Sequence, residues 1–296
     1  MKLREMGEDR LIARLTAGLG SGREVIVGPG DDCAVLASPQ RGERLLLKTD
    51  CVVEGVHFRP GEKGSAVGWK AMMRTLSDFA AMSGVPRYAL VTFVSPADRD
   101  ARWVTQLYSG LRRAADRFTV AIVGGETSGT KGPVVISISA LGVVERNRCV
   151  LRSGGQPGDV LFVTGRLGGS GKGGHLRFVA RIEEARWLTA NFRIHAMMDL
   201  SDGLGADLPR LAKASRVGFE IDETAIPRAR GCSIAQTIND GEDYELLFAV
   251  SPEEAARLQM KWRRKFPRLP LTQIGRLTDH AAAVSRHFFH GYVHFQ

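Results

Sequence analysis

The sequence lacks the features that mark membrane, secreted and zinc-binding proteins. Its 296 residues include no run of 18 consecutive apolar residues, so no transmembrane helix is predicted. The first thirty residues contain no apolar stretch that could serve as a signal peptide. The four cysteines are scattered and form no Cys-x-x-Cys pair, which argues against a zinc site and a disulfide framework. A soluble cytoplasmic protein is therefore the default expectation.

The composition also lacks a strong bias. Hydrophobic residues make up 44% and charged residues 25%, which is typical of a globular protein, and the length suffices for one large or two medium domains. The formal net charge of +9 permits nucleic-acid binding but does not establish it. A basic cluster at 261–268 follows a helical pattern and is typical of a solvated face. We expect only weak, salt-dependent contact with nucleic acid, and none that is specific.

The Asp-Leu-Ser-Asp-Gly sequence that begins at Asp199 is the most informative stretch. The apolar run Ile194–Met198 predicts a strand before it, and Leu204–Ala214 predicts a helix after it. Residues three apart at the start of a helix can point the same way, so Asp199 and Asp202 can converge. Two converging carboxylates suit a hard cation such as Mg²⁺. A plainer alternative is that Ser201 and Asp202 only cap the helix, which leaves Asp199 without a partner.

Acids follow or interrupt apolar segments elsewhere in the chain. Asp50 lies in an apolar run after the predicted strand Leu45–Leu47, where an unpaired charge would be costly. Glu126 follows the predicted strand Val120–Val123 and two glycines that allow close backbone approach. Two further acids belong to this set: Asp32, after a Gly-Pro-Gly turn, and Asp78, in the predicted helix Ala66–Ser83. Because strand ends gather at one rim of a parallel or mixed sheet, these acids predict a carboxylate cage that holds Mg²⁺ and polyphosphate.

We expect two domains, residues 1–145 and 146–296. A polar segment rich in glycine and proline, Glu145–Asp159, separates them, and the predicted strand Val160–Val163 opens the second. Apolar periodicity in the first domain predicts further elements: helices at Leu3–Leu19 and Asp98–Phe118, and strands at Tyr88–Val94 and Val134–Val144.

The second half contains a glycine-rich run, Gly165–Gly174. Three of its glycines formally match Gly-x-Gly-x-x-Gly, but the match occurs mid-chain and no acid stands at the distance that would hold a ribose. The run is no P-loop either, because Lys172 is followed by glycine. A flexible loop that covers phosphates and a plain linker are equal alternatives.

Five segments together resemble the thiamine-monophosphate kinase family. They occur in that family's order over nearly the whole chain: GDDCAVL at 30–36, TDCVVEGVHF at 49–58, LSDFAAM at 76–82, DLSDGL at 199–204 and GEDYELLF at 241–248. The wider superfamily includes aminoimidazole-ribonucleotide synthetase, selenophosphate synthetase and the hydrogenase maturation dehydratase. The EGVHF and GEDYEL sequences resemble the kinase branch in particular.

The resemblance implies an α/β fold with α+β character, of the two-domain aminoimidazole-ribonucleotide synthetase type. The N-terminal α/β domain would pair with that of a second copy to close a barrel, and the C-terminal domain would be α+β. The implied reaction is phosphoryl transfer from ATP to thiamine monophosphate, which gives ADP and thiamine diphosphate, with Mg²⁺ as the cofactor. The expected partners are these two substrates and a second copy of the chain, without a membrane.

The resemblance also implies roles for individual residues. Metal ligands are expected at Asp32, Thr49, Asp50, Asp78, Glu126, Asp199 and Asp202. ATP contacts are expected at Gly125, Glu126, Arg152 and Ser201. Substrate contacts are expected at His57, Glu242 and Phe289, and the catalytic residues are expected to be Asp50, Asp202 and Arg152.

The chemistry of this reaction agrees with a site rich in metal ligands. The acceptor is a phosphate monoester with a second pKa of about 6, so its attacking oxygen is largely ionised at neutral pH and needs no general base. The reaction instead requires screening between two polyanions and in-line positioning of the reacting groups. Carboxylates with bound metal ions supply both.

Several residues depart from the family's pattern. Glu126 replaces an aspartate, Gly169 replaces another, and Phe289 replaces a larger aromatic residue. Lys48 stands where a serine or threonine usually helps to bind metal, so it would either replace a metal ion or grip a phosphate. The segment between Gly174 and Asp199 is shorter than in the family. These changes leave the number of metal ions open.

Two other functions compete with the kinase. One is another ATP-using enzyme of the same superfamily that acts on a different small phosphate or acid. The other is a nucleotide-binding relative without turnover. Among the expected metal ligands every aspartate is retained except one, which is a conservative glutamate, and this argues against the second alternative.

Overall fold

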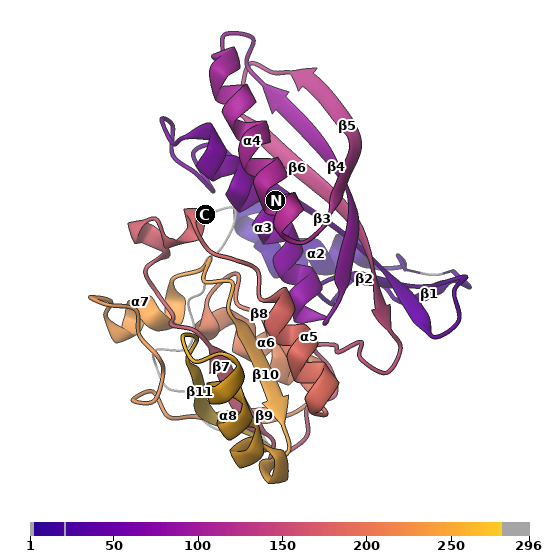
Figure 1. Ribbon diagram of the computed structural model, residues 1–296, viewed down its shortest axis with the longest axis vertical. Coiled ribbons are helices and arrows are strands. Elements are labelled where there is room, and N and C mark those ends of the chain that lie inside the picture. Colours follow the sequence, from indigo (N-terminus) through magenta and orange to yellow (C-terminus); the bar gives the residue numbers. More distant parts are fainter. Residues whose placement is uncertain (1–2, 21, 280–296) are drawn as a thin grey trace.

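The computed structural model describes residues 3–20 and 22–279 and contains two sheets flanked by helices (Figure 1). The first sheet has the strand order β1-β2-β3-β6-β4-β5, and only β4 and β5 run parallel. Its strands are β1 (Val25–Val27), β2 (Ala34–Ala37), β3 (Glu43–Val53), β4 (Val85–Ser95), β5 (Ala121–Gly129) and β6 (Val135–Glu145).

Two helices, α3 (Gly64–Ala81) and α4 (Ala101–Arg117), cover one face of this sheet. Glycines let the two helices approach closely. A Cβ atom at Gly68 would lie 2.0 Å from the carbonyl oxygen of Leu107, so no larger residue fits there. Most of α3 is buried because it packs against the sheet, α4 and the second half of the chain.

The other face of the first sheet is open and partly apolar. Along β4, Ala89 and Val91 point towards the helices and are buried, whereas Tyr88 and Leu90 are 52% and 47% exposed. Leu47 of β3 shares the cross-strand row of Tyr88 and is also exposed. This face therefore has apolar side chains but no covering layer within the described part of the chain.

The second sheet is antiparallel, with the strand order β8-β10-β7-β11-β9. Its strands are β7 (Val160–Thr164), β8 (Ala196–Asp199), β9 (Gly218–Ile221), β10 (Leu246–Val250) and β11 (Leu271–Thr278). Helices α5 (Ile182–Asn191) and α8 (Pro252–Lys265) pack on one face, and α6 (Leu204–Ser215) and α7 (Ile234–Asn239) pack on the other. Since both faces are covered, every residue of β7, β8 and β10 is buried, and these strands read as continuous apolar runs.

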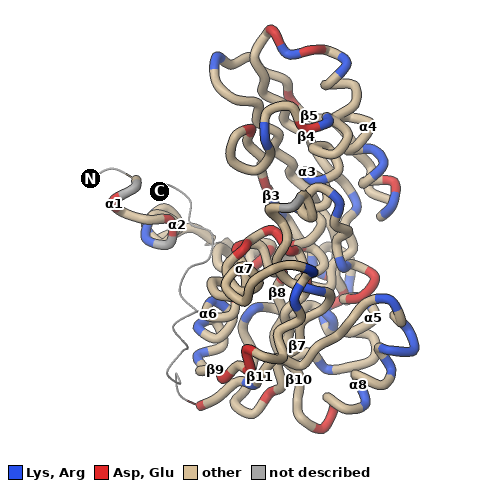
Figure 2. Tube along the Cα trace, turned by 90° about the vertical axis from the view of Figure 1, so that its left-hand side faces the viewer, with Lys and Arg blue, Asp and Glu red and all other residues tan. Residues whose placement is uncertain are grey.

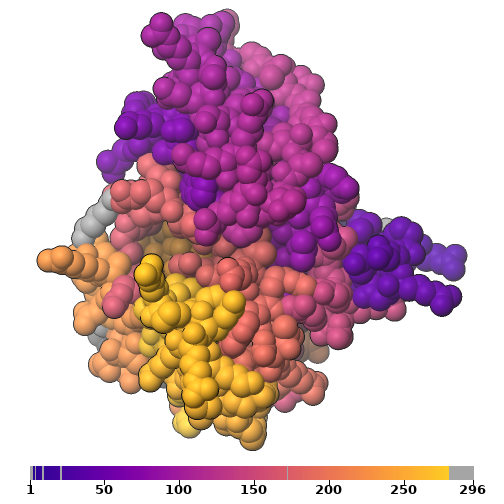
Figure 3. All heavy atoms as spheres, viewed as in Figure 1, coloured from indigo at the N-terminus to yellow at the C-terminus, as the bar shows by residue number. Residues whose placement is uncertain are grey.

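The two halves share a core and are stacked on each other (Figure 3). One hydrophobic cluster includes Leu76 of α3, Leu188 of α5 and Phe248 of β10. The helices α1 (Leu3–Met6) and α2 (Glu8–Thr16) project from this body (Figure 2). The same view shows Lys and Arg distributed over both halves, interspersed with acids.

The structure differs from the predicted elements at several points. The predicted helix Leu3–Leu19 is two helices, because Gly7 between them has a left-handed φ of 75°. The predicted strand Leu45–Leu47 is part of the longer β3, and the predicted strand Val120–Val123 overlaps the start of the longer β5, so Asp50 and Glu126 lie within strands. Helices α5 and α7 and strand β11 were not predicted from the sequence. None of the described helices has the length and apolarity needed to cross a membrane.

Candidate active site

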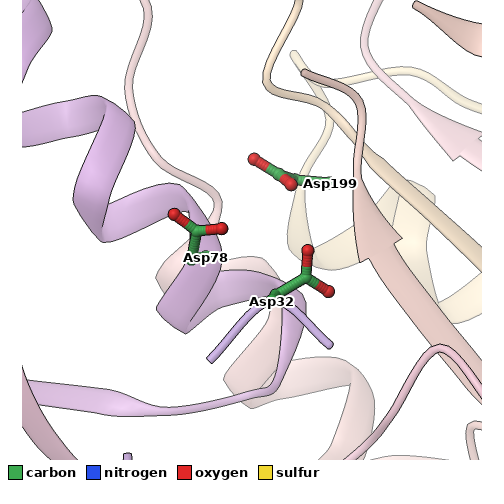
Figure 4. A group of neighbouring side chains, drawn as sticks. All are labelled: Asp32, Asp78 and Asp199. Atoms are coloured by element: carbon green, nitrogen blue, oxygen red, sulfur yellow. The ribbon is translucent and has the colours of Figure 1, made fainter. Parts of the chain in front are cut away.

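Three carboxylates meet where the two halves join (Figure 4). Asp32 precedes β2, Asp78 lies on α3 and Asp199 ends β8. One oxygen of each lies within 4.8 Å of the others, and all three residues are buried. The prediction that these acids gather at the rim of one sheet is therefore wrong. They meet because α3 packs against β8 and brings the two halves together.

Two fixed cations neutralise part of this cluster. The Lys48 ammonium group lies 2.7 Å from Asp78 Oδ1, and Arg152 donates a hydrogen bond of 2.5 Å to Asp32 Oδ1. The second oxygen, Asp32 Oδ2, is buried and has no hydrogen-bond partner among the described residues. The cluster therefore retains acceptor capacity that a cation could use.

The remaining carboxylate has a neutral partner. Ser77 Oγ donates a hydrogen bond of 2.5 Å to Asp199 Oδ2. Burial, helped by the nearby charge of Asp32, raises the pKa of Asp199 to about 6. Burial also raises the pKa of Asp78 well above its usual range, against the opposing effect of Lys48. The raised pKa values show that this buried site disfavours the ionised carboxylates, mainly because burial removes them from water.

Thr49 and Asp50 lie within β3 and outside this three-carboxylate group. Asp50 Oδ2 accepts a hydrogen bond of 3.2 Å from Arg74 Nε on α3. Thr49 is exposed, and its hydroxyl accepts a hydrogen bond of 3.1 Å from Ser139. Their roles as metal ligands stay predictions, as does the catalytic role of Asp50.

Asp202 pairs with Arg210 and likewise does not join the group. Its backbone N–H donates to Asp207 Oδ2 at 2.9 Å, and Arg210 also contacts Asp207. The alternative that Ser201 and Asp202 cap the helix is wrong. Gly203 occupies the N-cap of α6, which has no side-chain cap.

Gly125 and Glu126 lie on the edge strand β5. A Cβ atom at Gly125 would lie 1.8 Å from the carbonyl oxygen of Val91, so this position requires glycine. Glu126 is exposed and accepts a hydrogen bond of 3.1 Å from the Thr127 amide. Glu126 does not belong to the three-carboxylate group, and its contacts with metal and ATP remain predictions.

A cavity of about 100 Å³ opens between the two halves. Both halves of the chain contribute residues to its lining: Val56, His57, Arg74, Ser170, Ser201, Asp202, Gly241, Glu242 and Tyr244. The structure thus brings together two expected substrate contacts, His57 and Glu242, with Ser201 and Asp202. The third expected substrate contact, Phe289, lies outside the described residues.

The loop that carries Glu242 has an unusual backbone. Glu242 and Tyr244 have φ values of 65° and 52°, a left-handed conformation that costs a non-glycine residue about 1–3 kcal/mol. Hydrogen bonds from their amides to the carbonyl oxygens of Ser201 and Leu200 hold it, at 2.7 and 2.8 Å. Such strain at a cavity wall is typical of a functional loop.

The glycine-rich run forms two short 3₁₀ turns, Ser170–Lys172 and Gly174–Leu176. This is not the strand–turn–helix of a dinucleotide-binding motif, in agreement with the sequence analysis. The Gly168 amide donates to Asp243 at 2.9 Å, and Ser170 lines the cavity. The run is therefore part of the wall of the site and not a plain linker.

Several residues of α3 that face the site were not predicted from the sequence. Arg74 pairs with Asp50, Ser77 binds Asp199, and Lys70 contacts Glu242. A signal was present in the sequence. Positions 70, 74, 77 and 78 share one face of a helix, so three polar residues and one acid recur at helical spacing on a largely apolar element.

Family models match both halves of the chain. The model of AIR synthase related protein, N-terminal domain, matches residues 30–144, and the C-terminal domain model matches residues 156–286. Thiamine-monophosphate kinase from Rhodopirellula baltica is 38% identical, over 92% of each chain.

Solved structures give the same result. AaThiL complexed with AMPPCP and TMP is 31% identical, covers 99% of each chain and has a TM-score of 0.84. HypE from E. coli, a hydrogenase maturation protein, shares the fold at 21% identity, with a TM-score of 0.71 over 93% of this chain and 92% of its own. The chain therefore belongs to the thiamine-monophosphate kinase family, a kinase branch of the AIR synthase related proteins.

Proposed function

We propose that the chain transfers the γ-phosphoryl group of ATP to thiamine monophosphate and forms thiamine diphosphate. The cavity between the halves carries this proposal, because His57 and Glu242 line it together with Ser201 and Asp202. The names of the relatives support the substrates, as do the thiamine monophosphate and the ATP analogue bound to the similar AaThiL structure.

The three-carboxylate group fits Mg²⁺. Asp32, Asp78 and Asp199 offer buried oxygens within 4.8 Å of one another, and one oxygen of Asp32 has no protein donor in the described structure. Oxygen ligands are those that Mg²⁺ prefers. A bound Mg²⁺ would neutralise the charge that develops on the transferred phosphoryl group. Four residues complete the proposed ligand set: Thr49, Asp50, Glu126 and Asp202.

The protein's own cations would screen the two polyanionic substrates from each other. Arg74 lines the cavity, and Arg152 and Lys48 flank the carboxylates. We assign Arg152 to the ATP phosphates, together with Gly125 and Ser201. Since the acceptor phosphate is largely ionised, no side chain has to remove a proton, and binding and alignment are the tasks of the protein.

We propose direct in-line transfer without an aspartyl-phosphate intermediate. An aspartate that holds Mg²⁺ has its lone pairs committed to the cation and is a poor nucleophile. A covalent relay would also add a step without removing a difficult one, because the acceptor arrives ionised.

One experiment tests both the reaction and its path. The chain is incubated with γ-labelled ATP and Mg²⁺, first without acceptor and then with thiamine monophosphate. We expect an unlabelled protein in the first step and labelled thiamine diphosphate in the second. Label that stays on the protein and then passes to the acceptor at a competent rate would refute direct transfer. Turnover only with other small phosphates or acids would favour the alternative enzyme, and binding without turnover would favour the non-catalytic relative.

We also propose that two copies pair through the open face of the first sheet. Leu47, Tyr88, Leu90 and Val123 expose about half of their surface, and the first three lie on that face. Burying such a face against its copy removes apolar area from water, and a two-fold pair is the commonest solution.

The domain division at 145/146 and a cytoplasmic location remain predictions.

A further inference from the structure

Lys70 is a buried lysine behind the cavity. It lies on α3, and its side chain is 0% exposed. An ammonium group has three N–H donors, and three acceptors surround this one. They are the carbonyl oxygen of His57, His175 Nδ1 at 2.6 Å and Glu242 Oε1 at 2.6 Å. The contacts with His57 and His175 are hydrogen bonds, whereas the contact with Glu242 is an ion pair, because Glu242 Oε1 accepts no hydrogen bond within the described structure.

The three acceptors belong to separate segments. His57 follows β3, His175 lies in the second 3₁₀ turn of the glycine-rich run, and Glu242 precedes β10. His57 and Glu242 line the cavity, whereas neither Lys70 nor His175 is among its lining residues. Lys70 thus contacts two proposed substrate-binding residues, one from each half of the chain, and lies behind the residues that line the cavity.

The neighbouring residue strengthens this connection. Trp69 Nε1 donates a hydrogen bond of 2.7 Å to the carbonyl oxygen of Phe178. The Phe178 ring stacks on Tyr244, with centroids 4.1 Å apart, and Tyr244 lines the cavity. Two consecutive residues of α3 therefore hold the segment 170–178 and the loop that carries Glu242.

We propose that Lys70 is a positioning residue for the substrate. Its ammonium group fixes His57 and Glu242 relative to each other across the two halves and ties the segment 170–178 to α3. Burial of a charge is unfavourable, and an apolar side chain of similar length would fill the same space. The charge is useful here because it orients three acceptors at one point. The inference rests on the proposed function, since it concerns how the acceptor substrate is held.

A matched pair of variants at His175 gives the first test. In His175→Asn, the amide oxygen can replace Nδ1 as the acceptor for Lys70, whereas His175→Leu removes it. A lost hydrogen bond to a charged group corresponds to roughly a tenfold effect. We expect His175→Leu to raise the KM for thiamine monophosphate about tenfold, with the KM for ATP changed less than about twofold. His175→Asn should stay near the wild type.

The second test needs no substrate. Hydrogen exchange of the amides in 170–178 should be faster in Lys70→Met and in His175→Leu than in the wild type and His175→Asn. Equal effects of the two His175 variants, unchanged exchange, or a parallel rise of both KM values would overturn the inference. If Lys70→Met does not fold, the His175 pair decides alone. A wild type that makes no thiamine diphosphate would refute the proposed function, while hydrogen exchange would still decide the role of Lys70.

Discussion

Replacing Lys48 by methionine tests whether its ammonium group takes the place of one further metal ion beside the Mg²⁺ that the carboxylate cluster is proposed to hold. Lys48 Nζ lies 2.7 Å from Asp78 Oδ1, and the two side chains are 23% and 9% exposed. Asp32 and Asp199 each place an oxygen within 4.8 Å of one on Asp78. Lys48→Met therefore leaves three buried carboxylates with Arg152 as their remaining ion-pair partner among the described residues.

The size of the effect follows from this geometry. At 2.7 Å and an effective dielectric constant of about 20, the attraction is about 6 kcal/mol. Desolvation offsets part of it, and removal of one partner from a buried ion pair typically costs about 3–5 kcal/mol. Because Lys48 is partly exposed, we expect the lower end. The free energy of unfolding of metal-free Lys48→Met should be about 3 kcal/mol below that of the wild type.

Magnesium should reverse this loss. A metal ion at about 100 times its dissociation constant stabilises the folded protein by about 2.7 kcal/mol. Urea unfolding of the wild type and Lys48→Met, in EDTA and in excess Mg²⁺, measures both effects. Lys213→Met, at an exposed position of α6, is the control for the substitution itself. Equal stability in EDTA, or the same gain from Mg²⁺ in both proteins, would refute the reasoning.

Three further predictions concern catalysis, acid stability and assembly. Asp50→Asn and Asp202→Asn should each lose most turnover while the protein still folds, with a melting temperature lowered by the loss of the ion pairs with Arg74 and Arg210; near-normal rates in both would contradict their metal assignment. Hydrogen bonds from Arg186 lower the pKa of Glu145 to about 2, so the pair stabilises the fold above the unfolded pKa of 4.5, and this stability disappears as the pH falls towards 2. After solvent screening we expect the pair to contribute about 1 kcal/mol to the free energy of unfolding at pH 7 relative to pH 3. Urea unfolding at the two pH values should show this difference in the wild type and not in Glu145→Gln; an unchanged pH dependence in the variant would count against the pair. Light scattering should show a dimer at micromolar concentration and a monomer for Leu90→Glu; a monomeric wild type would exclude pairing through this face.

The sequence by itself determined most elements whose residues repeat with a clear period. The predicted strand Val134–Val144 corresponds to β6 (Val135–Glu145), and the predicted helix Ala66–Ser83 corresponds to α3. These agree because each element buries one face or nearly its whole surface, and burial imposes the apolar pattern that the sequence shows. Family motifs likewise pointed to His57 and Glu242, which line one cavity.

Only the tertiary structure decided which charges meet. The sequence suggested that Asp199 and Asp202 converge, but Asp199 joins Asp32 and Asp78, while Asp202 pairs with Arg210. It also gave no sign that the ends of β3 and β5 extend past Asp50 and Glu126, since those extensions depend on hydrogen bonds with neighbouring strands.

The physical reason is the distance along the chain between interacting groups. Arg152 and Asp32 are 120 residues apart in sequence, and Lys70 and His175 are 105 apart. A local pattern encodes burial, because each residue's own polarity favours the core or the solvent. It does not encode the partner of a buried charge, because that partner is set by how helix α3 packs between the two sheets.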